Sequence, residues 1–250
     1  MFLLRGQFSI DFYTGHPVLN YRLRNILCAV VMSSTCLMPS LASAGGISLG
    51  GTRVIYPAGQ KQVSMSVRNT SDQASFMVQS WVEQSNGQKS QDFVVTPPIY
   101  VSGPGNENTL RLMYIGKPLP QDRESIYYFN TKSIPSIDKQ AMENKNILLL
   151  AAITRIKLFV RPAGLKPDVA KAPESLTFTR INGQLRIDNP TPYHITLAKM
   201  KVGSQTLPDS MVSPKGSLSL PLAVSAGKTI AFRTINDFGA ATPEVRADIK

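Results

Sequence analysis

Cysteine and histidine are scarce in this 250-residue chain, which has two of each. Cys28, Cys36 and His16 all fall within the first 44 residues, so a chain cut after that point keeps only His194. Such a chain can form no disulfide, no zinc site of Cys or several His, and no cysteine nucleophile. A Ser-His-Asp triad would need His194, which follows the proline-rich turn 190–193 with no nucleophile-elbow glycines nearby. We therefore expect an ordinary surface histidine and no enzyme activity.

Long apolar runs are also missing, and the best candidate has the features of a cleavable leader. Arg22 and Arg24 precede the apolar run 26–38, which is shorter than the ~20 residues that a membrane span needs. The following segment ends in the Ala-x-Ala pattern of a signal-peptidase site at Ala44. We predict that residues 1–44 are removed and that the protein is exported; a retained membrane anchor is the alternative.

The chain has no run of like charges, no nucleic-acid signature and no phosphate-binding loop. The glycine cluster 45–51 is followed neither by Lys-Ser/Thr nor by a helical pattern. Removing the three Arg and one Asp of the leader from the whole-chain charge of +11 leaves +9. We expect this charge to serve solubility or an anionic protein partner, and we predict no nucleic acid, metal or other cofactor. A hydrolase with paired carboxylates stays open.

Short strand patterns separated by turns are plentiful. Residues 45–162 contain about seven of them, with turns every eight to twelve residues, which favours an immunoglobulin-like sandwich. Residues 161–167 interrupt the pattern as a linker would, and 163–250 contain a second, smaller set. The expected strands are 52–56, 62–68, 75–82, 93–95, 108–115, 125–130 and 147–159, then 176–179, 184–188, 194–202, 217–222 and 228–233. We predict an all-β fold of two immunoglobulin-like sandwich domains, 45–162 and 163–250.

The segment 147–159 differs from an ordinary half-buried strand, because its first half is apolar on both alternating faces. Such a strand is either central in a covered sheet or carries a face that awaits a partner. The residues alone leave both readings open, and we favour the second. We expect Leu149, Ala151 and Ile153 to pack inward.

The stretch 119–135, Leu-Pro-Gln-Asp-Arg-Glu-Ser-Ile-Tyr-Tyr-Phe-Asn-Thr-Lys-Ser-Ile-Pro, resembles the signature of periplasmic pilus-assembly chaperones, and it departs only at Thr131, where an aliphatic residue is usual. Further matching pieces are 52–57, 79–82, 96–98, 155–162, 189–193 and 234–240. The resemblance extends over nearly all of residues 47–243 and is greatest to the type 1 fimbrial chaperones. The resemblance implies two immunoglobulin-like domains at an angle, with a cleft between them.

The resemblance also implies a function, which is to cap pilin subunits in the periplasm by lending them a β-strand and to deliver them to an outer-membrane usher. Leu148, Leu150 and Ala152 match the side chains that are lent, although a larger aliphatic is frequent in place of Ala152. Arg53 and Lys157 match the cations that anchor the subunit's C-terminal carboxylate. A regular strand places Lys157 on the face opposite the leucines, so we expect a β-bulge or a strong twist after Ala152.

Glu124, Arg161 and Asp237 match the family's buried ion network, which we expect to hold the angle between the domains. The implied partners are pilin subunits and the usher, and whether free copies self-associate stays open. The alternative is a secreted two-domain adhesin or carbohydrate-binding module. That reading would explain the sandwiches and the aromatic residues, but neither Arg53 with Lys157 nor the signature around Glu124.

Overall fold

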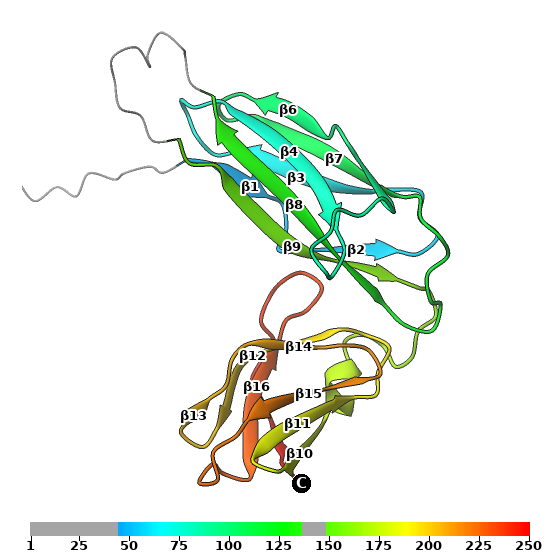
Figure 1. The fold of residues 1–250 in the computed structure, drawn as a ribbon, viewed down its shortest axis with the longest axis vertical. Coiled ribbons are helices and arrows are strands. Elements are labelled where there is room, and N and C mark those ends of the chain that lie inside the picture. The colour runs from blue at the N-terminus through cyan, green and yellow to red at the C-terminus, as the bar shows by residue number, and fades with distance from the viewer. Residues whose placement is uncertain (1–44, 137–148) are drawn as a thin grey trace, which may run out of the picture. The chain divides into compact units, whose positions relative to one another are not determined.

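The computed structural model describes residues 45–136 and 149–250, and these residues form strands and loops almost throughout (Figure 1). Within these two ranges the single helical segment is a short 3-10 turn, η1 (Ala172–Ser175). None of the described residues belongs to a helix long and apolar enough to cross a membrane. The predicted all-β fold of two immunoglobulin-like sandwiches is confirmed. The predicted leader, residues 1–44, lies outside the described residues.

The first sandwich contains a four-stranded and a five-stranded sheet. The four-stranded sheet has the order β1 (Ile47–Leu49), β3 (Val63–Asn69), β7 (Glu107–Tyr114) and β5 (Phe93–Thr96). The five-stranded sheet has the order β2 (Arg53–Pro57), β9 (Ala152–Arg161), β8 (Ser125–Pro135), β4 (Phe76–Glu83) and β6 (Ile99–Ser102). Alternate residues of these strands face a common core, in which Tyr56, Phe129, Leu110 and Leu158 are fully buried. Burial of these apolar side chains is the main force that holds the two sheets together.

The chain changes sheets between β1 and β2. β1 pairs with β3 in one sheet, whereas β2 pairs in parallel with β9 in the other, starting with Arg53 opposite Lys157. Gly50 allows the crossing, because a Cβ atom there would lie only 3.0 Å from the Cβ of Ser66. Since β2 begins only at Arg53, the part of β9 before Lys157 has β8 as its sole strand partner within the described ranges.

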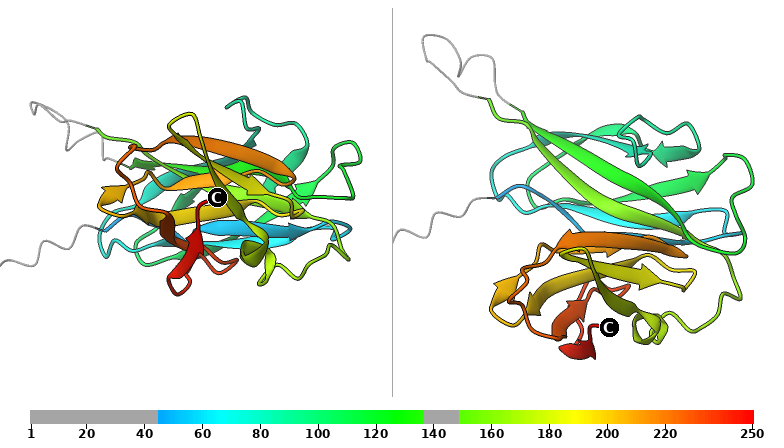
Figure 2. Two further views of the ribbon diagram at one scale, coloured as in Figure 1. Left: turned by 90° about the horizontal axis from the view of Figure 1, so that it is seen from below. Right: turned by 60° about the horizontal axis from the view of Figure 1, so that its bottom comes forward.

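The second sandwich packs its own core between two sheets, whose layers can be followed in the further views of Figure 2. One sheet has the order β10 (Thr177–Ile181), β11 (Gln184–Asn189) and β15 (Gly216–Pro221). The other has the order β13 (Gln205–Thr206), β12 (Ile195–Val202), β16 (Thr229–Thr234) and β17 (Val245–Asp248), with β14 (Ser210–Val212) paired to β12. Ile187, Leu197, Met200 and Ile230 are fully buried between the sheets.

Most of the predicted segments coincide with strands, but five short strands were not predicted. These are β1, β6, β13, β14 and β17, each of two to four residues. Segments this short contain too few alternations to give a period-two signal. β8 also continues to Pro135, beyond the predicted end at residue 130. The domain boundary between residues 162 and 163 stays a prediction.

Candidate functional site

One edge of β9 is left unpaired between residues 152 and 156 in the part of the chain that the structure describes. The side chains of Ala152, Thr154 and their neighbours are exposed there, whereas Ile156 and Leu158 are buried in the first core. Ala152, Thr154, Ile156 and Leu158 lie on the same face of β9. The last two lie within the core, and the first two lie beyond its end. An unpaired edge of this kind offers backbone N–H and C=O groups to an added strand.

The apolar residues just before this edge are exposed as well. The exposed fraction is 45% for Leu149 and 71% for Leu150, and Ile153 within β9 is 59% exposed. The prediction that Leu149, Ala151 and Ile153 pack inward is therefore wrong. Alternation separates two rows but does not say which row faces the core, and here the buried row is the one that contains Ile156 and Leu158. Leu150 and Ala152 are exposed, and Leu148 lies outside the described residues.

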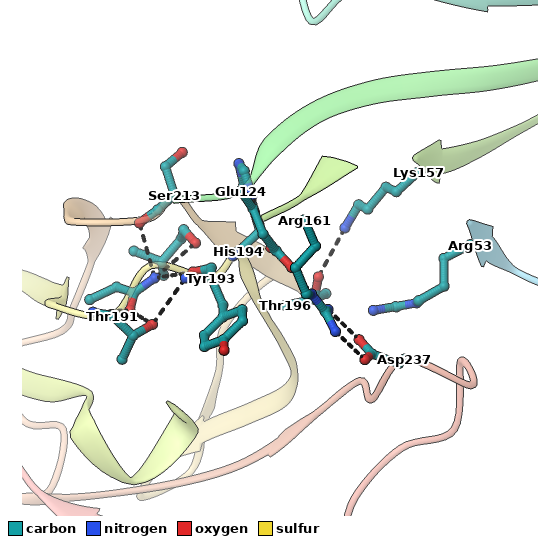
Figure 3. A network of polar contacts seen from close by, with 12 residues as sticks. Arg53, Glu124, Lys157, Arg161, Thr191, Tyr193, His194, Thr196, Ser213 and Asp237 are labelled. Atoms are coloured by element: carbon teal, nitrogen blue, oxygen red, sulfur yellow. Dashed lines mark hydrogen bonds and ion pairs between the residues drawn. The ribbon is translucent and has the colours of Figure 1, made fainter. Parts of the chain in front are cut away.

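No β-bulge separates Ala152 from Lys157. The register between β8 and β9 runs without a break over residues 152–160, so the bulge is excluded, whereas the strong twist that was its alternative stays a prediction. Lys157 thus lies on the face opposite the core-facing row, and its side chain extends to the second sandwich, where Nζ donates a hydrogen bond to Oγ1 of Thr196 at 3.1 Å (Figure 3). The lysine side chain is long enough to reach Thr196 from a regular strand.

Arg53 lies beside Lys157, because the two residues are register partners in β2 and β9 (Figure 3). Its Nη1 donates a hydrogen bond to the carbonyl oxygen of Ile235 at 3.1 Å, and its Nε is buried without a hydrogen-bond partner. Among the described residues, no carboxylate forms an ion pair with Arg53 or Lys157. The site therefore holds two neighbouring cations with unused donor capacity.

Burial lowers the pKa of both cations. For Lys157, desolvation is the larger cause and the adjacent charge of Arg53 adds to it. For Arg53, desolvation also dominates, and the negative charges of Asp237 and Glu124 partly oppose it. An incoming carboxylate would raise both pKa values again, since it supplies the opposite charge and accepts hydrogen bonds.

Next to this pair, Arg161 is fully satisfied by two carboxylates. Its Nε donates to Oε1 of Glu124 at 2.6 Å, and its Nη1 and Nη2 donate to the two carboxylate oxygens of Asp237 at 2.6 and 2.7 Å (Figure 3). Burial alone would lower the pKa of Arg161, but the hydrogen bonds and charges of Asp237 and Glu124 outweigh it and raise that pKa. The three predicted network residues thus meet, and they link the residue before β8 and the end of β9 in the first sandwich to the loop after β16 in the second.

His194 joins the same network, although local sequence patterns did not predict it there. Its backbone N–H donates to Oε2 of Glu124 at 2.8 Å, and its ring Nδ1 lies 3.4 Å from that oxygen. The side chain is only 5% exposed, and the ring packs on Phe159 with 5.4 Å between centroids. The prediction of a surface histidine is wrong. The burial of His194 could have been predicted from one signal, the family-like turn 189–193 that directly precedes it. In that turn, the carbonyl oxygen of Pro192 accepts a hydrogen bond from the backbone N–H of Glu124.

A pocket of about 250 Å³ opens beside Arg53. Arg161 and Asp237 border it together with apolar side chains, which include Phe159, Ile235 and Phe238. In the described part of the chain, no three or more His, Cys, Asp or Glu side chains gather in a way that could hold a metal ion. The arrangement is suited to binding a chain end with a carboxylate.

Comparisons with known proteins match both sandwiches. The family described as "Pili and flagellar-assembly chaperone, PapD N-terminal domain" matches residues 46–166. The family described as "Pili assembly chaperone PapD, C-terminal domain" matches residues 171–246.

Curated relatives and solved structures agree with these matches. The probable fimbrial chaperone SfmC of Escherichia coli K12 is 42% identical over 217 residues, which cover 87% of this chain and 94% of SfmC. The chaperone protein FimC of the same strain is 42% identical over 221 residues, covering 88% and 91%. The crystal structure of the periplasmic chaperone SfaE is 42% identical with a TM-score of 0.69, covering 80% of this chain and 98% of SfaE. A structure of the Salmonella enterica SafA pilin in complex with the SafB chaperone gives 27% identity and a TM-score of 0.74, with coverages of 81% and 96%.

We predict that Glu124→Gln destabilises the protein by roughly 3–5 kcal/mol, the usual cost of breaking a buried ion pair. The Glu124 side chain is 1% exposed and Arg161 is 18% exposed, so the guanidinium would keep Asp237 but lose its most buried charged partner, with little access to water in its place. Urea unfolding measures the difference. The matched control is Asp122→Asn, since Asp122 is an exposed carboxylate two residues away, and this change should have little effect. Equal unfolding curves for Glu124→Gln and the wild type would contradict the prediction.

Proposed function

The chain belongs to the family of pilus-assembly chaperones, and we propose that it caps pilin subunits by lending them β9 and delivers them to an outer-membrane usher. It would do this in the periplasm, after cleavage of the leader at Ala44. It would act by binding alone, with no catalysed reaction and no cofactor.

The observation that carries this proposal is the edge of β9 that no described strand pairs with, beside two cations that form no ion pair with any described carboxylate. A subunit strand added along residues 152–156 would complete the ladder of main-chain hydrogen bonds. Its terminal carboxylate would then accept charge-assisted hydrogen bonds from Arg53 and Lys157. Because its carboxyl end lies at Lys157, the added strand would run parallel to β9. It would lie in line with β2, which begins where the added strand ends.

The exposed side chains before and within this edge would provide the apolar contact. Leu150 and Ala152 face water in the free protein, and we propose that they fill the space left by the subunit's missing strand, together with Leu148. Complete burial of a leucine contributes roughly 1.5–3 kcal/mol, so the two leucines should contribute more than Ala152.

The carboxylate anchor and the apolar row have different tasks in this scheme. The row supplies contact area that any apolar groove accepts, but it does not define where the subunit strand stops. The two cations supply that definition, because a terminal carboxylate reaches both Arg53 and Lys157 in only one register. We further propose that Glu124, Arg161 and Asp237 keep the second sandwich in place beside this anchor.

Replacing either cation by alanine should weaken capture of a pilin subunit roughly 10- to 100-fold, because hydrogen bonds to charged groups contribute about 1.5–3 kcal/mol. The measurement is the amount of a co-produced pilin that copurifies with tagged Arg53→Ala or Lys157→Ala protein from the periplasm. Lys61→Ala is the control, since Lys61 is an exposed cation in a turn of the same sandwich. Undiminished capture by both cation variants would refute the anchor.

The affinity for a subunit should also fall at alkaline pH. The pKa of Lys157 is lowered in the free protein, whereas a bound carboxylate favours the charged amine. Above the free-state pKa, binding therefore requires uptake of a proton, and the affinity decreases as the pH rises. Lys157→Arg should move this decrease to higher pH, because arginine stays protonated. Identical pH profiles for the two proteins would show that Lys157 is not the titrating group.

Leu150→Glu should leave the protein folded but abolish capture, because the side chain is 71% exposed in the free state and would meet an apolar groove in the complex. Urea unfolding and copurification of the pilin are the two measurements. Ile181→Glu serves as the control, since Ile181 is an exposed apolar residue of the second sandwich; it should affect neither result. If Leu150→Glu instead unfolds the protein, Leu150 belongs to the chaperone's own core.

A further inference from the structure

We propose that the pocket beside Arg53 is a subsite for the side chain of the subunit's last residue, with Phe238 as its outer wall. The inference rests on the proposed function, because the subunit's carboxylate brings that residue to the pocket. The subsite would favour an apolar or aromatic last residue over an acidic one.

Phe238 is a large apolar residue held in an unusual position. Its side chain is 92% exposed in the free protein, yet the loop that carries it, between β16 and β17, is tightly organised. Oδ1 of Asn236 accepts hydrogen bonds from the backbone N–H groups of Phe238 and Ala240 at 3.1 and 3.0 Å. Asp237, directly before Phe238, is held by Arg161. The backbone of Phe238 is therefore held in a defined loop, from which the ring extends into solvent.

The same loop lies against the beginning of β2. Arg53 donates to the carbonyl oxygen of Ile235 in this loop. Gly239 approaches Thr52 so closely that a Cβ atom on it would lie 2.0 Å from the threonine Oγ1, and its φ of +84° also favours glycine. Phe238 directly precedes Gly239, whose backbone packs against Thr52. Thr52 in turn precedes Arg53, where the proposed subunit strand ends.

The pocket has the chemistry to take an apolar side chain. Phe159, Ile195, Ile235 and Phe238 are among the residues that line it. Its volume of about 250 Å³ leaves room for a side chain of any size that occurs in proteins. A carboxylate bonded to Arg53, whose Nε is buried without a partner, would leave the Cα atom of the last residue at the pocket.

The charged residues of the pocket set its preference. Arg161 is neutralised by Glu124 and Asp237, which also line the pocket. An acidic last side chain would face these two carboxylates and meet no free cation besides Arg53, which the terminal carboxylate already engages. An aromatic side chain would instead gain edge or face contacts with Phe159 and Phe238.

The test uses the mature chain and synthetic peptides of alternating valine and serine with a fluorescent label at the amino end. The peptides differ only in the last residue, which is tyrosine, leucine or aspartate, and each is also made with an amidated carboxyl end. Fluorescence anisotropy gives the affinities. We expect the tyrosine and leucine peptides to bind roughly tenfold more tightly than the aspartate peptide, and Phe238→Ala to reduce this preference to about twofold.

The matched control is Val224→Ala, because Val224 is 89% exposed on a different loop and does not line the pocket. This variant should keep the full preference, and Phe238→Leu should keep most of it. The exposed position of Phe238 means that its substitution should leave the urea unfolding curve unchanged.

The amidated peptides test the carboxylate anchor independently of the subsite. Weak binding of every amide supports the carboxylate anchor, whatever the last residue is. If that dependence holds but tyrosine, leucine and aspartate peptides bind equally, or if Phe238→Ala keeps the full preference, the subsite is refuted and the proposed function stands. If the wild type shows no dependence on the free carboxylate, the anchor and the subsite are both refuted.

Discussion

The unmade hydrogen bonds along one edge of β9 are the constraint on which the rest of the structure depends. Backbone N–H and C=O groups must either be paired or stay in contact with water. The chain crosses between sheets at Gly50 and leaves residues 152–156 with β8 as their strand partner on one side only, within the described ranges. The other edge stays available, while β8 keeps the strand straight and in register. A preformed strand costs little further ordering when a partner adds to it.

The three cations near this edge differ in whether they have a carboxylate partner. Arg161 engages both Glu124 and Asp237, so the nearest carboxylates are already used. Arg53 and Lys157 lie next to that cluster without an ion pair to any described carboxylate. Had the carboxylates been shared equally among the three cations, none would attract an external anion strongly. In the proposed complex, the paired arginine would hold the second sandwich in place, and Arg53 with Lys157 would bind the subunit's carboxylate.

Alternation and turn spacing were sufficient to predict both sandwiches, and the motif around Glu124 together with six further matching segments was sufficient to predict the family, which the comparisons confirm. The errors share a physical cause. Alternation divides 147–159 into two rows, but only the end of the core decides that Ile156 is buried while Ala152 is exposed. His194 was misjudged because its burial comes from Glu124, which is 70 residues away in sequence. Contacts made across such separations leave no mark on local periodicity.

β2 lies parallel to β9, and a captured strand with its carboxyl end at Arg53 would have the same direction. Parallel ladders are slightly less stable per residue than antiparallel ones. In the proposed complex, the subunit is therefore completed by a substitute that is not its best partner. If a segment of another subunit entered the same groove antiparallel, it could displace β9 with a net decrease in free energy. Polymer growth would then need no nucleotide hydrolysis, since each exchange is driven by the greater stability of the contact that replaces the chaperone.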